Sequence, residues 1–301
     1  MNKLIFLDVD GTLVDYQGNL PVSAVRAVDE AHEAGNQVFL CTGRSMMDAG
    51  PIRDAVKADG VIGGGGTYIE DNGQVIAHSP IPEDAERAIV DWLLERGLEI
   101  VVETNSGMYA SDGFPEAAKG AAYEYRNGLN GVPHPAGPIA AAYLPAIATL
   151  GLPEDSGPVR HISAPLIVGE SLYRNDANKV SVLLNTPDDV EAARRAFPDM
   201  RVAPWGGAGE LPLFAEISVN GIDKATAVRR LVEHRGGNMD DTIAFGDAAA
   251  DAPMLEACKV GVAMGGSGDE ARRAADIVAG DVEDDGLYEA FSELGLLTQP
   301  S

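Results

Sequence analysis

Cysteine and basic residues are scarce in this 301-residue chain, and each shortage excludes a class of protein. The only cysteines, Cys41 and Cys258, lie far apart in the sequence. Their number excludes a disulfide framework and a cysteine-based zinc site, and it fits a reducing compartment. Lysine and arginine total 22 against 47 aspartates and glutamates, a formal net charge of −25. Such a surface repels phosphate backbones and anionic lipids, so we expect no nucleic-acid and no membrane partner.

Long hydrophobic runs are also missing. No apolar stretch approaches the roughly 18 residues that a membrane-spanning helix needs. The short apolar run near the N-terminus ends at Asp8, too early for a signal peptide. We therefore expect a cytoplasmic protein. Apolar residues make up 45% of the chain, enough for a large core, and the length allows one large domain or two smaller ones.

The chain does contain a regular alternation of apolar runs and amphipathic segments. Residues 4–9 and 37–43 are apolar runs typical of strands buried in a parallel sheet. Between them, residues 21–35 carry valine and alanine near helical spacing, with Pro21 at the start and Gly35 at the end. A strand, a helix and a strand in this order predict a right-handed crossover unit.

Further along, residues 67–78 predict a hairpin with Asn72-Gly73 as its turn. The last third repeats the alternation, with predicted strands at residues 213–218, 241–247 and 259–264.

The middle of the chain has helices and strands of its own, joined by Pro/Gly-rich connections. We therefore predict an α/β protein with two parts. Residues 1–81 and 209–301 would form a doubly wound, Rossmann-like parallel-sheet core, and residues 82–208 an inserted α/β cap domain.

Four polar groups fall at or near the carboxyl ends of predicted strands, where open α/β sheets bind ligands. They are the pair Asp8 and Asp10, the run Thr42-Gly43-Arg44, Lys224, and Asp247 with Asp251 four residues later. Each has a structural alternative. An aspartate at a strand end can be a helix cap or a turn former, Thr42 can cap the next helix, and Lys224 can be a solvated lysine. Their shared position favours a common site.

A phosphoryl group accounts for this set. The carboxylates of Asp8, Asp10 and Asp247 would repel a phosphate unless a divalent cation intervened, and Mg²⁺ is commonly held by carboxylates together with phosphate oxygens. Asp8 would then lie close enough to attack phosphorus. Asp10 would protonate the leaving oxygen and later deprotonate a water molecule. Thr42, Lys224 and nearby backbone N–H groups would hold the equatorial oxygens.

These motifs resemble those of the haloacid dehalogenase (HAD) superfamily of aspartyl phosphatases. "DVDGTLV" is similar to the first motif, "CTGR" to the Thr/Ser motif, "NGIDKATAV" to the lysine motif and "FGDAAADAPML" to the acidic motif. The downstream "VGVAMGGSGDEARRAADIV" resembles the Cof-type branch, whose cap lies between the second and third motifs. The resemblance covers residues 1–80 and 209–301 well, and the middle in placement more than in sequence.

The resemblance implies a role for each site residue. Asp8 would be the nucleophile that forms an aspartyl-phosphate, and Asp10 the general acid/base. Mg²⁺ would be held by Asp8, the backbone carbonyl of Asp10, and Asp247. Asp251 would either lie behind these metal ligands and support them, or assist Lys224. The phosphate contacts would come from the Val9 backbone, Thr42, Gly43 and Lys224.

Three positions depart from the family pattern, because Gly64, Ala250 and Gly266 stand where asparagine is usual. None is the nucleophile, the acid/base or a carboxylate ligand. We therefore expect a working Mg²⁺-dependent phosphatase with an altered phosphate pocket, acting on a small cytosolic phosphomonoester such as a sugar phosphate or a cofactor phosphate. Two alternatives stay open: a sugar phosphomutase, and a phospholigand-binding protein with weak turnover.

Overall fold

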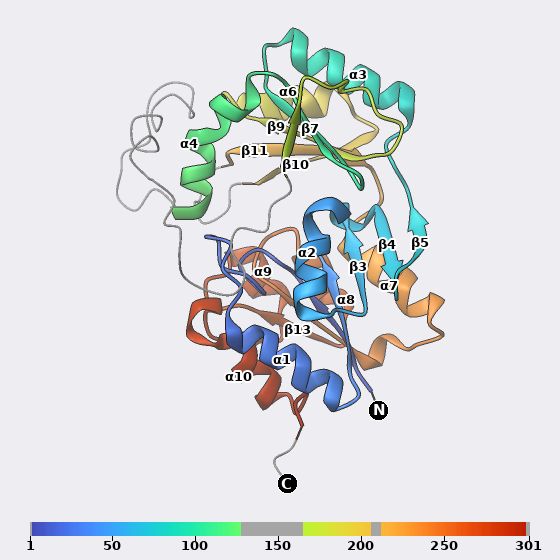
Figure 1. The fold of residues 1–301 in the computed structure, drawn as a ribbon, viewed down its shortest axis with the longest axis vertical. Coiled ribbons are helices and arrows are strands. Elements are labelled where there is room, and N and C mark those ends of the chain that lie inside the picture. The colour runs from blue at the N-terminus through green and yellow to red at the C-terminus, as the bar shows by residue number, and fades with distance from the viewer. Residues whose placement is uncertain (1, 128–164, 206–211, 299–301) are drawn as a thin grey trace. The chain divides into compact units, whose positions relative to one another are not determined.

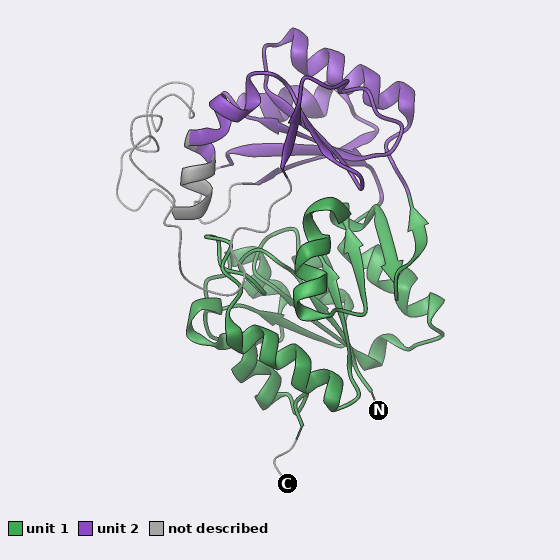
Figure 2. Cartoon of the chain, in the orientation of Figure 1, with its two compact units in different colours: residues 1–78, 157–163, 222–301 green, residues 79–156, 164–221 purple. Residues whose placement is uncertain are grey.

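The computed structural model describes residues 2–127, 165–205 and 212–298, and Figure 1 traces the chain through them. These residues fall into two compact units (Figure 2). The first unit comprises residues 2–78 and 222–298, and the second comprises the described residues from 79 to 221. Among the described residues, no helix is both long enough and apolar enough to cross a lipid bilayer.

The first unit is built on an eight-stranded sheet with the order β14-β13-β12-β1-β2-β3-β4-β5. All neighbouring pairs are parallel except β3–β4 and β4–β5. Its strands are β1 (Leu4–Leu7), β2 (Gln37–Cys41), β3 (Gly60–Gly63), β4 (Tyr68–Asp71), β5 (Gln74–His78), β12 (Thr242–Gly246), β13 (Val260–Ala263) and β14 (Ile277–Val278).

Both faces of this sheet are covered by helices, as the continuous apolar runs predict. Successive side chains of a strand point to opposite faces, so Ile5 and Leu7 join one hydrophobic core, and Leu4 and Phe6 join the other. Helices α1 (Val22–Glu33), α2 (Met46–Val56) and α10 (Gly286–Glu293) supply the first core. Helices α7 (Lys224–His234), α8 (Ala252–Ala257) and α9 (Asp269–Ala274) supply the second. The predicted doubly wound α/β class is therefore confirmed.

The strand register brings the sequence motifs together at one point. Leu7, the last residue of β1, pairs with Leu40 of β2 on one side and with Phe245 of β12 on the other. The chain runs outward from β1 to β2 and β3, and later returns to the opposite side of β1 at β12. This reversal is the switch point at which open α/β sheets bind their ligands.

The predicted hairpin is confirmed as the antiparallel pair β4 and β5. Asn72 and Gly73 both have positive φ, 49° and 78°, which the favoured two-residue hairpin turn requires. Asparagine and glycine adopt this conformation most readily, so the local sequence decided this turn.

The second unit contains a separate six-stranded sheet with the order β10-β11-β9-β6-β7-β8. Its strands are β6 (Ile100–Thr104), β7 (Met108–Ala110), β8 (Leu166–Val168), β9 (Ala177–Leu183), β10 (Met200–Trp205) and β11 (Phe214–Val219). Helices α3 (Glu83–Glu95) and α6 (Asp188–Ala196) pack on one face, and Phe114 and Ala118 of α4 (Phe114–Asn127) pack on the other.

One predicted strand lies in the other sheet. The sequence placed residues 213–218 in the parallel core, but β11 pairs antiparallel with β9 and β10 in the second unit. Five of its six residues are buried, because side chains cover this sheet on both faces. An apolar run of this kind identifies a strand buried on both faces, but it does not identify the strand's partners.

The second unit also buries a network of charged side chains. Lys179 Nζ lies 3.0 Å from Glu216 Oε2 and 3.6 Å from Glu103 Oε1. Arg201 reaches the other Glu216 oxygen at 2.5 Å, and Ser181 donates to Glu103 at 2.5 Å. Buried charges are tolerated when they are paired and hydrogen-bonded in this way.

Candidate active site

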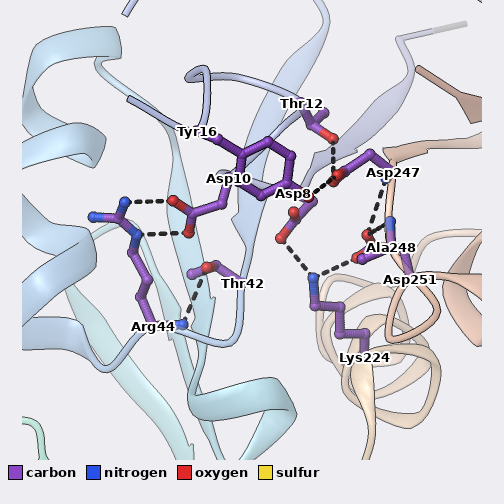
Figure 3. Close-up of polar contacts among 10 residues, drawn as sticks. All are labelled: Asp8, Asp10, Thr12, Tyr16, Thr42, Arg44, Lys224, Asp247, Ala248 and Asp251. Carbon is purple, nitrogen blue, oxygen red and sulfur yellow. Dashed lines mark hydrogen bonds and ion pairs between the residues drawn. The ribbon is translucent and has the colours of Figure 1, made fainter. Parts of the chain in front are cut away.

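The site begins with Asp8, which directly follows β1 and is buried (Figure 3). Lys224, the first residue of α7, places its Nζ 2.6 Å from Asp8 Oδ1. Lys224 is only 5% exposed, so the alternative of a solvated lysine does not apply. A capping box between Asp223 and Thr226 begins α7 at this residue and directs the lysine to the carboxylate.

Asp247 and Asp251 complete an acidic cluster with Asp8. Oxygens of the three carboxylates lie within 4.8 Å of one another, and all three residues are buried. Asp251 also receives the Lys224 ammonium, while its Oδ2 accepts from the backbone N–H groups of Asp247 and Ala248 at 3.0 and 2.9 Å. Asp251 therefore anchors both the lysine and the turn that carries Asp247.

Asp10 is held differently from the sequence expectation. Its carboxylate is not part of the acidic cluster; the third carboxylate there is that of Asp251. Arg44 instead donates from Nε and from a terminal nitrogen to the two Asp10 oxygens, at 2.9 and 2.6 Å (Figure 3). The like charges of Asp8 and Asp10 are thus partly offset by a bidentate arginine. Arg44 also lies 3.2 Å from Asp48 of α2.

The turn after Asp10 brings two hydroxyl groups to Asp247. Gly11 has φ of +82°, and a Cβ there would lie 2.2 Å from Asp247 Oδ2, so only glycine fits. Thr12 Oγ1 donates to Asp247 Oδ1 at 3.3 Å, and the Tyr16 hydroxyl donates to Asp247 Oδ2 at 2.5 Å. The sequence contained no signal for Tyr16, whereas Arg44 stood beside Thr42 but had no role assigned.

The predicted phosphate contacts lie on the neighbouring strand ends. Thr42 directly follows β2 and is buried, and its Oγ1 accepts from the Arg44 N–H at 3.1 Å. Because α2 begins at Met46, Thr42 is not its cap. Gly43 is half-buried. The Val9 carbonyl accepts from the N–H groups of residues 12, 13 and 14 and so folds the turn after β1. Ala250 is exposed in the turn between Asp247 and Asp251.

The electrostatics of the cluster are unbalanced. Three carboxylates face one ammonium, an excess of two negative charges when all are ionised. Burial, followed by the Asp251 carboxylate, raises the pKa of Asp8 to about 7. Burial, followed by the Asp8 charge, raises the pKa of Asp247 well above its usual range. Burial by itself would lower the pKa of Lys224, but the Asp251 and Asp8 carboxylates raise it, so this residue stays cationic.

This donor set fits a hard divalent cation. Carboxylate and carbonyl oxygens are the ligands that Mg²⁺ accepts, and the excess negative charge is what a cation would neutralise. Asp8 Oδ1 and one Asp251 oxygen are occupied by Lys224. Asp8 Oδ2 and the Asp247 carboxylate are therefore the natural side-chain donors. A carboxylate oxygen that accepts one hydrogen bond retains a second lone pair.

Comparison with known proteins identifies the family. The model of the haloacid dehalogenase-like hydrolases matches residues 5–135 and 160–291. The chain belongs to the haloacid dehalogenase-like hydrolase family. The chain is 28% identical to YkrA of Bacillus subtilis (strain 168), over 98% of this chain and 99% of that protein. It is 26% identical to the pyridoxal phosphate phosphatase YbhA of Escherichia coli (strain K12), over 95% and 96%.

Solved structures of haloacid dehalogenase-like hydrolases share the fold. The subclass IIB sugar phosphatase BT4131 has a TM-score of 0.71 at 21% identity, covering 98% of this chain and 100% of that one. A haloacid dehalogenase-like hydrolase from B. subtilis has a TM-score of 0.75 at 21% identity, covering 97% and 99%. The membership of the HAD superfamily and its Cof-type branch, expected from the motifs, is thereby confirmed.

Proposed function

We propose that this HAD hydrolase is a Mg²⁺-dependent phosphatase that hydrolyses small phosphomonoesters through an aspartyl-phosphate on Asp8. The observation that carries the proposal is the buried contact of 2.6 Å between Lys224 Nζ and Asp8 Oδ1 beside Asp247. This arrangement places the Asp8 carboxylate at a ligand-binding strand end, the Lys224 ammonium beside it, and carboxylate oxygens where they can bind a metal. The name of the relative YbhA, a pyridoxal phosphate phosphatase, supports a small phosphomonoester as the substrate class.

In the first half-reaction, an Asp8 carboxylate oxygen attacks phosphorus, and the bond from phosphorus to the ester oxygen breaks. Asp10 delivers a proton to that leaving oxygen, which departs as an alcohol. Arg44 holds both Asp10 oxygens and so fixes the direction of the carboxyl group. Thr42 and Lys224, with the backbone N–H groups near Val9 and Gly43, hold the non-bridging oxygens.

In the second half-reaction, Asp10 takes a proton from water. The hydroxide attacks the phosphorus of the aspartyl-phosphate, inorganic phosphate leaves, and the Asp8 carboxylate is restored. Lys224 stays paired with Asp251 throughout and so offsets the negative charge beside Asp8. Asp8, the Asp10 carbonyl and Asp247 would hold the Mg²⁺, which when bound neutralises the charge between these carboxylates and the phosphate.

The test is phosphate release from p-nitrophenyl phosphate in the presence of Mg²⁺. We expect Asp8→Asn to reduce kcat/KM by at least about a thousandfold, the scale seen when a nucleophile is removed. Asp54→Asn, which changes an exposed carboxylate in α2, is the matched control and should retain wild-type activity. Equal rates for Asp8→Asn and the wild type would refute the proposal.

The same assay with a panel of phosphorylated metabolites separates the two alternatives. Free inorganic phosphate as the main product supports hydrolysis, whereas an isomeric sugar phosphate identifies a phosphomutase. Tight binding of a phosphate ester without turnover at saturating Mg²⁺ identifies a binding protein.

A further inference from the structure

Tyr16 makes a contact that the proposed chemistry has not used. Its hydroxyl donates to Asp247 Oδ2 across 231 positions of sequence, at 2.5 Å. Thr12, the other hydroxyl donor to this carboxylate, is 3.3 Å from Oδ1. Tyr16 therefore makes the shorter of the two hydroxyl contacts that orient Asp247.

The backbone around Tyr16 is built to place it there. Residues 15–19 form a closed loop, in which the Asp15 N–H donates to the Asn19 carbonyl at 3.0 Å. The buried Asp15 carboxylate accepts from the Asn19 backbone N–H and side-chain amide, both at 2.7 Å. Asp15 and Asn19 thus restrain the loop at both of its ends, and the half-buried Tyr16 projects from it toward Asp247 (Figure 3).

The remaining sides of Asp247 are also constrained. Gly11 approaches Oδ2 so closely that no side chain fits between them. The Asp247 carbonyl accepts from the Gly268 N–H at 2.9 Å, and its own N–H donates to Asp251. The backbone of Asp247 is therefore fixed by hydrogen bonds. Among the described residues, two hydroxyl groups donate to its carboxylate and so set its rotation.

We propose that Tyr16 is a positioning residue for the cation site, holding the Asp247 carboxylate in the rotation that accepts Mg²⁺. This inference rests on the metal site of the proposed function. A phenol that donates to one lone pair of Oδ2 leaves the other lone pairs of the carboxylate for a cation. Groups that hydrogen-bond a metal's ligands commonly change metal affinity by about 10- to 100-fold when removed.

The test is the variant Tyr16→Phe, which removes one oxygen and keeps the ring. Mg²⁺ binding is measured by calorimetry on the protein without substrate, and Asp247→Asn shows which heat belongs to this site. We expect the Kd for Mg²⁺ to rise about tenfold or more in Tyr16→Phe. The Mg²⁺ concentration that gives half-maximal hydrolysis of p-nitrophenyl phosphate should rise by a similar factor.

Tyr288→Phe is the matched control. Tyr288 also donates its phenol to a carboxylate, that of Glu30 at 3.2 Å, but in the packing of α1 against α10. Its Kd for Mg²⁺ should match the wild type. Thermal melts give a second readout. For each variant, the Tm with Mg²⁺ minus the Tm without Mg²⁺ measures how much the metal stabilises that variant. A loss of stability alone would lower both melts and leave their difference unchanged.

Each remaining outcome is decisive. An unchanged Kd, or tighter Mg²⁺ binding in Tyr16→Phe, overturns the role of Tyr16; tighter binding would mean that the phenol competes with the cation. Either result leaves phosphatase activity, and with it the proposed function, intact. Failure of the wild type to bind Mg²⁺ overturns both the metal site and this inference.

Discussion

Glu86 of α3 is a carboxylate whose burial should make the second unit less stable as the pH rises. Its side chain is fully buried, one oxygen accepts from the Arg174 N–H at 3.0 Å, and Oε2 has no partner among the described residues. Burial raises the pKa of Glu86 from 4.5 to about 7, and the Arg174 N–H opposes this shift. The folded chain therefore favours the protonated carboxyl group.

The sign and size follow from the two pKa values. A group whose pKa is higher in the folded state stabilises the fold below its unfolded pKa, and that stability is lost as the pH rises through the folded value. Here the loss begins near 4.5 and is complete above about 7. Between about pH 5 and about pH 8 it amounts to roughly 2.5 kcal/mol, and over the whole range to about 3 kcal/mol.

The assay is urea denaturation followed by tryptophan fluorescence. Both tryptophans of the chain, Trp92 and Trp205, lie in the second unit with Glu86, so the signal reports this unit. Glu86→Gln keeps the shape of the side chain but does not titrate. Between about pH 5 and about pH 8, the free energy of unfolding of the wild type should fall by roughly 2.5 kcal/mol more than that of Glu86→Gln. Glu83→Gln, at an exposed position of the same helix, should keep the wild-type slope. Identical slopes for Glu86→Gln and the wild type would refute the reasoning.

Two further predictions concern the ion pairs that the fold brings together. Arg44→Lys keeps a positive charge but cannot donate two parallel hydrogen bonds to Asp10. We therefore expect kcat at saturating Mg²⁺ to fall about tenfold or more, and KM to stay within about twofold of the wild type. A change confined to KM would place Arg44 in substrate binding instead. Lys179→Met leaves two buried carboxylates without their shared cation and should lower the free energy of unfolding by about 3–5 kcal/mol in urea melts. Lys119→Met, at an exposed position, is the control and should change the free energy of unfolding by no more than about 0.5 kcal/mol. An equally small effect for Lys179→Met would contradict the role of Lys179 as the cation that the two buried carboxylates share.

Patterns that depend on near neighbours in the chain were predictable. The apolar run of β1, the crossover to β2 and the Asn72-Gly73 turn follow from side-chain period and turn chemistry. The meeting of Asp8 and Asp247 was also predictable, because both follow strands at the ligand-binding edge of a parallel sheet. Lys224 was expected there from residues 213–218, but that strand lies in the other sheet, and the lysine reaches Asp8 from the start of α7.

The sequence alone therefore determined the α/β class, the family and most of the acidic site, since motif spacing and strand ends encode them locally. Only the tertiary structure decided that β11 joins the second sheet, that Arg44 takes both oxygens of Asp10 and that Tyr16 reaches Asp247. The physical reason is that strand partners and long-range hydrogen bonds depend on which surfaces meet after folding. An apolar run, a lone arginine or a lone tyrosine carries no local mark of that choice.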